Sequence, residues 1–401
     1  MTESNWQIKQ LGELFRISSS KRVLKSQWQN KGIPFYRGRE ITCLANNGCV
    51  DNELFISEEL YSNFVKNYGV PNIGDIVITA IGTIGNSYVV KETDKFYFKD
   101  ASVLWLNKIT NTNSYFINMW LKSTLFKEQL EKGNGATVDT LTIQKLQGLK
   151  VYIPPLAEQQ RIVTILDKVF AGIEKAKENA KKNLQNAKEL FELFLENTFT
   201  HLEDQHGKRK LAEVCDRMEY GSAAKSKKEG KIPVLRMGNI QNGRFTWTDL
   251  VYSDSDSEIA KYLLKYNDVL FNRTNSPELV GKTAIYKGEQ PAIFAGYLIR
   301  IHRKEAVLDG DYLNYFLNCN IAKKHGKTVV ISSVNQANIN GKKLKDYFLP
   351  IPPLKEQQRI VTVFDTLSTK TKKLEAIYQQ KLSDLEELKK SVLKKAFSGE
   401  L

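Results

Sequence analysis

The second half of the chain contains a turn-like stretch, NRTNSPELVGK, in which side chains able to bond to nucleic-acid bases lie close together. Asn272, Arg273, Asn275 and Lys282 fall within eleven residues. Arg and Lys can donate hydrogen bonds to guanine, and Asn can bond to adenine through two hydrogen bonds. The alternative for each residue on its own is a surface or turn-forming role. The grouping predicts a loop that contacts DNA bases.

Similar side chains occur in other polar or glycine-flanked stretches, where the backbone can approach DNA closely. The further DNA-binding candidates are Arg37, Arg39, Thr83, Asn86 and Thr137 in the first half, and Arg236, Asn335 and Gln336 in the second. Basic residues that touch phosphate would position the protein without choosing bases. We therefore expect both halves of the chain to bind DNA.

Motifs for catalysis or for nucleotide binding are missing or incomplete. The chain has no [DN]PP[YFW] tetrapeptide of an adenine methyltransferase. In SPELVGKT, Ser276 stands where the phosphate-binding pattern GxxxxGK[ST] has its first glycine. His201 and His206 lie in HLEDQHGKRK, which we expect to be a polar linker rather than part of a metal site. The sequence thus predicts a non-catalytic protein that binds no metal and no cofactor itself.

Composition agrees with a globular DNA-binding protein. The 401 residues carry a net charge of +14, with 41% hydrophobic and 26% charged residues. A positive excess of this size favours a polyanionic partner, and it lies mostly in residues 1–156 and 201–354. The four cysteines are scattered, so we expect reduced thiols. No apolar run suggests a membrane span and the N-terminus does not resemble a signal peptide, so we expect a cytoplasmic protein.

One phrase occurs twice, as IPPLAEQQRIV at 153–163 and as IPPLKEQQRIV at 351–361. Each copy precedes a proline-free stretch whose apolar residues follow heptad-like spacing, from Ile162 to Phe194 in the first copy. The second copy repeats this spacing at an offset of 198, with Thr371 and Lys389 as exceptions. We predict long helices at 157–200 and 355–401 that pack antiparallel as a coiled coil. Two ordinary amphipathic core helices are the alternative.

The segments before the helices also resemble each other. IPFYRGREI from Ile33 is similar to IPVLRMGNI from Ile232, and Asp75 and Asp268 each precede an apolar run. We expect an α+β fold in which two mixed, β-rich domains, 1–156 and 201–354, form an internal pseudo-two-fold repeat. Such a protein matches a divided DNA site, with one domain per half-site and the helices setting the gap. An autonomous two-headed DNA-binding protein, such as a repressor or an architectural clamp, fits the same pattern.

The chain resembles the DNA-specificity subunits of type I restriction-modification enzymes along essentially its whole length. The resemblance rests on the doubled IPPLxEQQRIV phrase, the tandem segments, DVLFNRTNSPELVGK and the ending LKKSVLKKAFSGEL. It implies a non-catalytic subunit with two target-recognition domains that read a bipartite, asymmetric DNA sequence. It also implies two adenine methyltransferase subunits docked on the helices and motor-nuclease subunits that join them. S-adenosylmethionine, ATP and Mg would then be bound by those partner subunits.

The doubled EQQR tetrapeptide remains to be explained. Glu158 suits the first turn of a helix, because the helix dipole favours an anion there. Four identical polar residues at both helix entries indicate a contact made twice, either with the adjacent domain or with an identical partner. The predicted partner-binding residues are Glu158, Gln159, Gln160 and Arg161 in the first copy and Glu356, Gln357, Gln358 and Arg359 in the second.

Overall fold

The computed structural model describes residues 6–131, 140–333 and 336–401, except for the side chains of residues 332, 333 and 336. The chain divides into two compact units. The first unit consists of Met1–Ala180 and Gln380–Leu401, and the second unit is Lys181–Gln379. Two long helices, α7 (Leu156–His206) and α13 (Leu354–Ser398), each contribute a segment to both units. In the described part of the chain, no helix is both long and apolar enough to cross a membrane.

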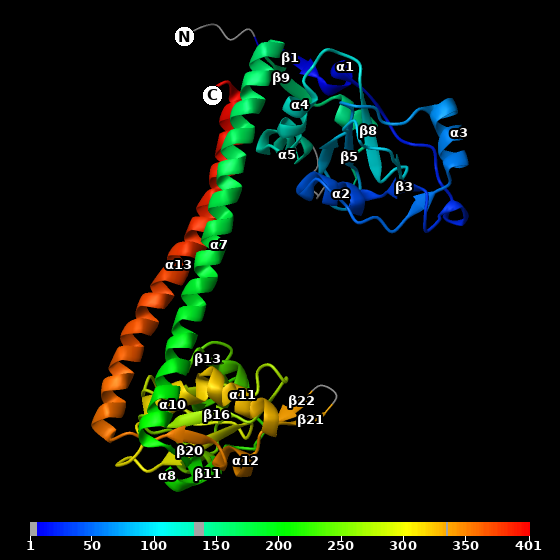
Figure 1. Ribbon diagram of the computed structural model, residues 1–401. Coiled ribbons are helices and arrows are strands. Elements are labelled where there is room, and N and C mark those ends of the chain that lie inside the picture. Colours follow the sequence, from blue (N-terminus) through cyan, green and yellow to red (C-terminus); the bar gives the residue numbers. More distant parts are fainter. Residues whose placement is uncertain (1–5, 132–139, 334–335) are drawn as a thin grey trace. The chain divides into compact units, whose positions relative to one another are not determined.

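A four-stranded antiparallel sheet is the centre of the first unit (Figure 1). Its strands, in spatial order, are β2 (Phe15–Ser18), β8 (Val103–Lys108), β5 (Ile76–Thr79) and β6 (Ser87–Val89). Ile76 lies opposite Leu106 and Val77 opposite Trp105. Because neighbouring side chains on a strand point to opposite faces, Ile76 and Val77 fall in different apolar clusters on the two sides of the sheet.

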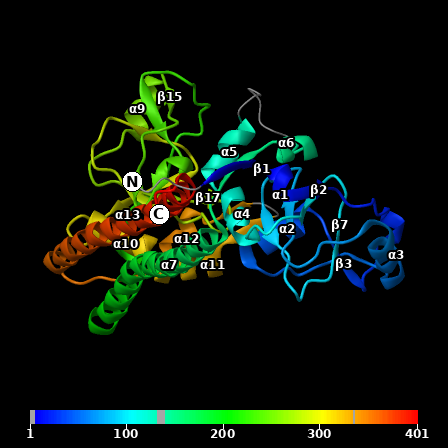
Figure 2. The ribbon, with the colours of Figure 1, turned by 90° about the horizontal axis from the view of Figure 1, so that it is seen from above.

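A smaller sheet and several helices complete this unit. The other strands are β1 (Gln7–Gln10), which pairs with β9 (Lys150–Ile153), and the sheet β4 (Phe55–Ile56), β3 (Ile33–Tyr36) and β7 (Tyr97–Phe98). The helices are α1 (Leu11–Leu14), η1 (Lys25–Gln27), α2 (Gly38–Asn47), α3 (Glu58–Tyr68), α4 (Ser114–Leu121), α5 (Thr124–Glu131) and α6 (Ile143–Gln147). Both views place α3 at the side of the unit away from α5 (Figures 1 and 2).

The second unit repeats this arrangement. Its four-stranded sheet is β11 (Cys215–Tyr220), β20 (Leu298–Arg303), β16 (Val269–Asn272) and β18 (Thr283–Ile285). Its smaller sheet is β15 (Val251–Ser253), β12 (Ile232–Leu235) and β19 (Ile293–Phe294), and β10 (Lys208–Lys210) pairs with β23 (Phe348–Pro350). The predicted internal repeat and mixed α and β composition are confirmed.

Two strand groups occur in the second unit and not among the described strands of the first. They are the hairpin β13 (Ile240–Gln241) with β14 (Arg244–Phe245), and the sheet β17 (Thr274–Asn275), β22 (Gln336–Asn338) and β21 (Ile331–Ser333). In the described part of the first unit, only the isolated antiparallel bridge between Ile81 and Thr140 stands at the place of the β17–β22 pair. The remaining helices are α8 (Leu211–Val214), η2 (Met237–Asn239), α9 (Asp256–Tyr262), α10 (Gly310–Asn318), α11 (Asn320–Val329) and α12 (Gly341–Lys345).

Within each unit, the segments of α7 and α13 pack antiparallel, as predicted. In the first unit, Lys177 Nζ lies 2.6 Å from Glu386 Oε1, and Lys389 Nζ lies 3.1 Å from Glu174 Oε1. In the second unit, the ring of Phe364 packs edge-on or tilted against α7, with its centroid 5.6 Å from that of Phe199. Residue numbers rise along one helix where they fall along the other, which defines the antiparallel direction.

The apolar positions expected at the helix contact are mostly buried or half-buried, but Phe194 and Leu374 are exposed. Thr371, an exception to the apolar pattern, is only 2% exposed, and its buried hydroxyl is satisfied because it donates to the carbonyl oxygen of Leu367 at 3.0 Å. Phe194, predicted at the contact, is 37% exposed, whereas Leu195 is 2% exposed. The buried stripe therefore shifts by one residue near the end of α7.

The predicted polar linker HLEDQHGKRK is wrong in its first part. Helix α7 continues through His201 and ends at His206. Leu202, only 3% exposed, extends the buried stripe of the helix into the core of the second unit. Gly207 ends the helix with φ of 65°, and its N–H donates to the carbonyl oxygen of Glu203 at 2.9 Å. A left-handed glycine at this position is a common helix stop.

Candidate nucleic-acid interface

Three of the predicted DNA-binding residues in the second unit line one open cavity. Arg236, Asn275 and Lys282 border a cavity of about 460 Å³. They come from the residue after β12, from β17 and from the residue before β18. The cavity therefore gathers a guanidinium, an amide and an ammonium group, which are the side-chain types that bond to base edges and phosphates.

The β13–β14 hairpin supplies further polar groups to this cavity. Gln241 lies in its lining and is exposed. The turn residues Asn242 and Gly243 have φ of 51° and 77°, as a two-residue turn of the primed type requires. Sequence reasoning missed Gln241, although the Asn-Gly pair that follows it is a strong hairpin signal. The amide of Asn314 in α10 fixes the turn, because its Nδ2 donates to the carbonyl oxygen of Gly243 at 3.0 Å.

The local fold presents Arg236 beside this hairpin. Its backbone N–H donates to Oδ1 of the buried Asn239 at 2.9 Å, and its Nη2 donates to the carbonyl oxygen of Asp249 at 2.6 Å. Asn239 in turn donates to the carbonyl oxygens of Thr246 and Thr248 at 3.2 and 3.0 Å. Arg236 is exposed, so its other guanidinium N–H groups face solvent. Two of its bonds thus hold the arginine in a defined direction.

Two other candidates from the NRTN stretch are used inside the unit. Asn272 is 0% exposed, and its backbone N–H donates to the carbonyl oxygen of Lys282 at 2.8 Å. Because its side chain is buried in the turn, Asn272 shapes the loop and does not reach its surface. Arg273 is half-buried, and its guanidinium lies 4.9 Å from the ring centroid of Tyr220. Among the described residues, no acceptor bonds to the buried Nε of Arg273.

In the first unit, Arg37 occupies the place that corresponds to Arg236. Its Nη2 and Nε donate to the two carboxylate oxygens of Glu40 at 2.8 and 3.1 Å. Burial alone would raise the pKa of the Glu40 carboxyl, but the bonds from Arg37 hold it below its ordinary value. The same pair raises the pKa of Arg37. Arg39 is more open, because its side chain is 63% exposed and its partner Glu53 is also exposed.

The loop before β6 lies against α2. Thr83 is exposed, and Asn86 Nδ2 donates to Thr42 Oγ1 of α2 at 3.0 Å. Arg39, Thr83 and Asn86 therefore belong to one region around the start of α2. Of the other candidates, Thr137 and Asn335 lie outside the described residues, and Gln336 begins β22 with its side chain outside the description.

The repeated EQQR tetrapeptide has one buried member in each copy, the first glutamine. Gln159 is 3% exposed, and Gln357 is 0% exposed. Gln159 Oε1 accepts from the backbone N–H of Asn113 at 2.8 Å, and its Nε2 donates to the carbonyl oxygen of Pro154 at 2.8 Å. Asn113 is the N-cap residue of α4. The glutamine thus connects the start of α7 to the start of α4.

Gln357 makes the equivalent connection in the second unit. Its Oε1 accepts from the N–H of Asp309, the N-cap residue of α10, at 2.9 Å, and its Nε2 donates to the carbonyl oxygen of Pro352 at 2.8 Å. Gln159 and Gln357 were both predicted to bind a partner. The structure corrects this for their side chains, which are buried and bonded within their own units.

The other residues of the tetrapeptide lie at the surface to different degrees. Glu158 and Glu356 are half-buried, and the exposed members are Gln160, Arg161, Gln358 and Arg359. Arg161 bonds to Glu158 through Nε and Nη2 at 2.7 Å each, which lowers the pKa of Glu158. Glu356 lies 3.5 Å from Nε2 of His206 instead.

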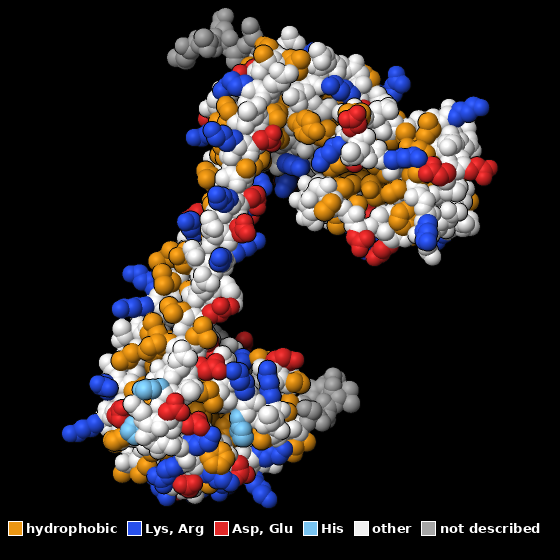
Figure 3. Space-filling model, viewed as in Figure 1, with side chains coloured by type: hydrophobic (Ala, Val, Ile, Leu, Met, Phe, Trp, Pro, Cys, Tyr) orange, Lys and Arg blue, Asp and Glu red, His pale blue; other side chains and the backbone are white. Residues whose placement is uncertain are grey.

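Exposed apolar side chains follow the long helices of the second unit (Figure 3). Leu190 and Leu193 of α7 are 51% and 55% exposed, and Leu374 and Ile377 of α13 are 39% and 49% exposed. No group of three His, Cys, Asp or Glu residues suited to a metal ion occurs in the ranges that the structure describes.

Comparisons with known proteins agree with this two-part organisation. The family model of the type I restriction modification DNA specificity domain matches residues 3–183 and again residues 204–383. The EcoKI specificity subunit of Escherichia coli is 27% identical over 72% of this chain and 66% of its own length. The StySPI specificity subunit of Salmonella potsdam is 24% identical over 71% of this chain and 65% of its own length. The chain thus spans slightly less than two thirds of each of these relatives.

Two solved structures share the fold. A chain from a structure of a type I R-M system matches 100% of this chain, with 99% of its own length covered, a TM-score of 0.76 and 18% identity. The HsdS subunit of Thermoanaerobacter tengcongensis matches over 100% of both chains with a TM-score of 0.62 and 18% identity. Since two copies of the specificity domain together cover most of the sequence, the chain belongs to the type I restriction-modification DNA specificity family.

Proposed function

We propose that this protein reads a bipartite DNA sequence, with one half-site bound by each target-recognition domain, as the specificity subunit of a type I restriction-modification complex. The observation that carries the proposal is the duplicated specificity domain. Each copy has its own polar surface at the end of an equivalent strand, at Arg37 after β3 and at Arg236 after β12. Two domains that share a fold but have different polar surfaces suit a DNA site made of two different half-sites.

In this proposal, the recognition domains are residues 1–156 and 201–354, and the spacer helices are 157–200 and 355–401. The side chains assigned to DNA are the exposed or half-buried polar ones in the two regions: Arg39, Thr83 and Asn86 in the first, and Arg236, Asn275 and Lys282 in the second. Gln241 joins this set because it lines the same cavity as Arg236. Arg37 and Arg273 retain guanidinium N–H groups beyond their internal contacts and stay in the set.

The helices serve, in this proposal, as the docking surface for two adenine methyltransferase subunits. Gln160 and Arg161 on one helix entry and Gln358 and Arg359 on the other are exposed and identical in type. An identical partner can therefore make the same polar contact twice. The exposed leucines and isoleucine of the second unit supply apolar area elsewhere on the same helices. S-adenosylmethionine, ATP and Mg would be bound by partner subunits in the cytoplasm, including motor-nuclease subunits.

The test is single-molecule sequencing of genomic DNA from a host with the gene intact and with the gene deleted. We expect N6-methyladenine to disappear from one split motif on deletion and to return with a plasmid copy. Unchanged methylation in a strain that expresses the methyltransferase genes would contradict the proposal. Sequence-specific DNA binding by the purified chain, without any recruited methyltransferase, would instead support an autonomous DNA-binding protein.

A further inference from the structure

The cavity that Arg236, Asn275 and Lys282 border also has apolar side chains in its wall. Met237 and Leu279 line it and are 38% and 40% exposed. Met237 begins η2 directly after Arg236, and Leu279 lies in the turn between β17 and β18. Sequence reasoning predicted neither residue as a DNA contact. The polar groups of the cavity suit hydrogen bonds to DNA, so the two apolar side chains need a different kind of contact.

The turn between β17 and β18 holds the backbone of Leu279 in place. Its N–H donates to the carbonyl oxygen of Ser276 at 3.0 Å, and its carbonyl oxygen accepts from Nδ2 of the buried Asn272 at 3.5 Å. The backbone of Asn272 joins the same turn, since its N–H donates to the carbonyl oxygen of Lys282 at 2.8 Å and its carbonyl oxygen accepts from the N–H of Gly281 at 2.9 Å. Because both backbone polar groups of Leu279 are bonded inside the unit, the part of this residue presented to the cavity is its apolar side chain.

The bases of DNA offer one apolar group to such a side chain. In the major groove, the C5-methyl group of thymine distinguishes a T·A pair, and proteins read it through apolar contacts. A backbone phosphate fits this cavity less well, because the exposed Asp249 also lines it and like charges repel. The lining therefore favours a base edge that carries a methyl group.

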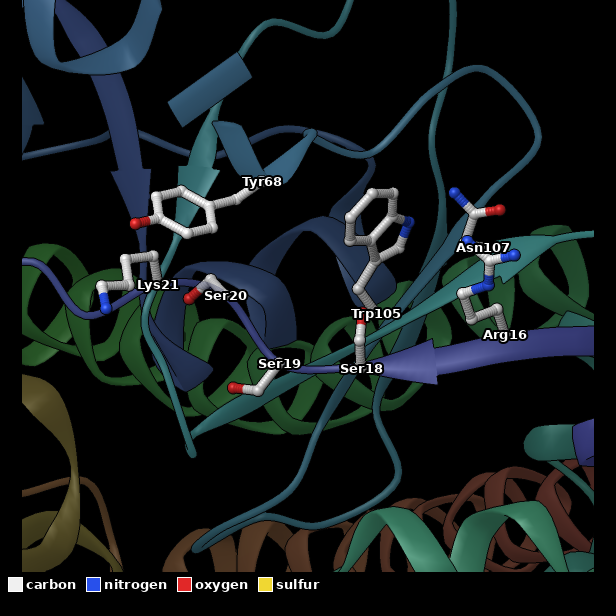
Figure 4. A pocket seen from close by; sticks show the side chains of 8 residues that line it. All are labelled: Arg16, Ser18, Ser19, Ser20, Lys21, Tyr68, Trp105 and Asn107. Atoms are coloured by element: carbon white, nitrogen blue, oxygen red, sulfur yellow. The ribbon is translucent and has the colours of Figure 1, made fainter. Parts of the chain in front are cut away.

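The cavity of the first unit has a different wall. It has a volume of about 380 Å³, and Arg16 and Lys21 lie at its opposite ends with Trp105 between them (Figure 4). Its other lining residues are serines, an asparagine and Tyr68, so none of the described side chains there is aliphatic. It also contains none of the predicted base-reading residues. The aliphatic wall beside base-reading residues is thus a feature of the second unit.

We propose that Leu279 contacts the C5-methyl group of a thymine in the half-site bound by the second unit, and that this contact selects a T·A pair at one position. The inference rests on the proposed function and names a base for it. Met237 adds apolar surface to the same cavity. Arg236, Asn275 and Lys282 bond to polar atoms of the same half-site.

The test replaces each thymine of the split motif in turn by deoxyuridine, which removes the methyl group and keeps every hydrogen-bonding group of the base. Binding of these duplexes is measured for the full chain together with its methyltransferase subunits. At one position of one half-site, we expect uracil to weaken binding about fourfold, which is the effect of burying one methyl-sized group.

Variants assign this difference to Leu279. In Leu279→Ala, the thymine and uracil duplexes should bind equally at that position. Leu279→Met keeps a large apolar side chain and should retain most of the difference. The matched control is Leu263→Ala, because Leu263 is 42% exposed, follows α9 and lies outside the cavity lining. This control should leave the fourfold difference unchanged.

Three results would overturn the proposal. Equal binding of thymine and uracil duplexes at every position by the wild-type chain would exclude a methyl contact, and this comparison needs no variant. A fourfold difference that persists in Leu279→Ala would assign the methyl contact to another residue. Loss of the difference in Leu263→Ala as well would show that exposed apolar area in general causes it.

Failure of the proposed function would look different. Genome sequencing would then find no split motif that loses methylation when the gene is deleted. Duplexes selected from random sequence by the purified chain would replace the motif in the test, and selection of no sequence would overturn the inference as well. A split motif without a thymine effect would remove the Leu279 contact and leave the proposed function standing.

Discussion

At the scale of single residues, the buried glutamines explain part of the reason why the EQQR tetrapeptide occurs twice. Gln159 and Gln357 each bond both to the N-cap residue of a domain helix and to a carbonyl of the IPP turn. A buried amide that satisfies two backbone groups is costly to remove, since those groups are left without partners. The phrase therefore fixes how each long helix begins on its own domain, and its exposed members remain free for a partner.

The first prediction concerns these glutamines. We expect Gln159→Ala or Gln357→Ala to lower the free energy of unfolding by about 2–3 kcal/mol, because buried donor and acceptor groups lose their partners. The matched controls are Gln160→Ala and Gln358→Ala, which lie next in sequence but are exposed, and should cost under about 0.5 kcal/mol. Urea unfolding of the full chain measures all four. Equal effects at buried and exposed positions would contradict the assignment.

The second prediction concerns Glu219. Burial alone would raise its pKa, but the bonds from His302 and Arg300 hold the pKa below its ordinary value of 4.5. A lowered pKa in the folded state stabilises the protein above the unfolded value, and this stability is lost as pH falls through the folded value. We expect unfolding free energy to decrease below about pH 4.5, and Glu219→Gln to weaken that decrease while lowering stability near neutral pH.

Calorimetry of the full chain from neutral to acidic pH would check this prediction. The control is Glu305→Gln, whose side chain is 81% exposed and lies 3.4 Å from Arg303. An exposed pair of this kind contributes little to stability. If both variants change the pH dependence equally, the bonds of Glu219 to Arg300 and His302 are not the cause of that dependence.

At the scale of elements, the sequence predicted the helices and strands that have a periodic apolar pattern, and it did not predict the short hairpin that depends on a local turn. The long helices, the strands IPFY and IPVL and the strands after Asp75 and Asp268 all follow from apolar spacing. The β13–β14 hairpin was missed because its strands have only two residues each. The burial of Asn272 and Gln159 could not be predicted either. A polar residue type does not show whether its hydrogen-bond partners lie inside the fold or in the solvent.

The third prediction tests the hairpin. Gly243 has φ of 77°, and an added Cβ would lie 3.2 Å from Nδ2 of Asn314. We expect Gly243→Ala to cost about 1–2 kcal/mol of backbone strain and to move the hairpin off α10. Because Gln241 belongs to this hairpin and lines the cavity around Arg236, base selection at one half-site should relax. Sequencing of methylated motifs and thermal unfolding measure the two effects.

Gly48→Ala is the control for that variant. Gly48 has φ of 72°, but an added Cβ would meet no atom within 4 Å. We expect the Gly48→Ala variant to lose stability through backbone strain alone and to recognise the same bases at both half-sites as the wild type. Relaxed recognition in Gly48→Ala would show that strain, rather than the position of the hairpin, governs base selection.

At the scale of the whole molecule, the two units share a frame and differ where they are proposed to contact bases. After the equivalent strands β3 and β12, the first unit forms helix α2, and the second forms η2 and the hairpin. The same paired arginine and polar residue begin both segments, Arg37 with Glu40 and Arg236 with Asn239. This arrangement allows the segment that contacts DNA in one unit to change in sequence without disturbing the sheets of the other unit.

The last prediction follows from this separation. We expect Arg236→Ala to relax one half of the methylated motif and Arg39→Ala to relax the other, each with a loss of about 1–3 kcal/mol in discrimination, which is the range for a good bidentate base contact. The double variant should relax both halves, and the number of unread base pairs between them should stay constant in all three. Effects on sites read by different domains should add, since distant, independent sites usually do so. A single substitution that alters both halves, or that changes the gap, would mean that the two units do not read DNA independently.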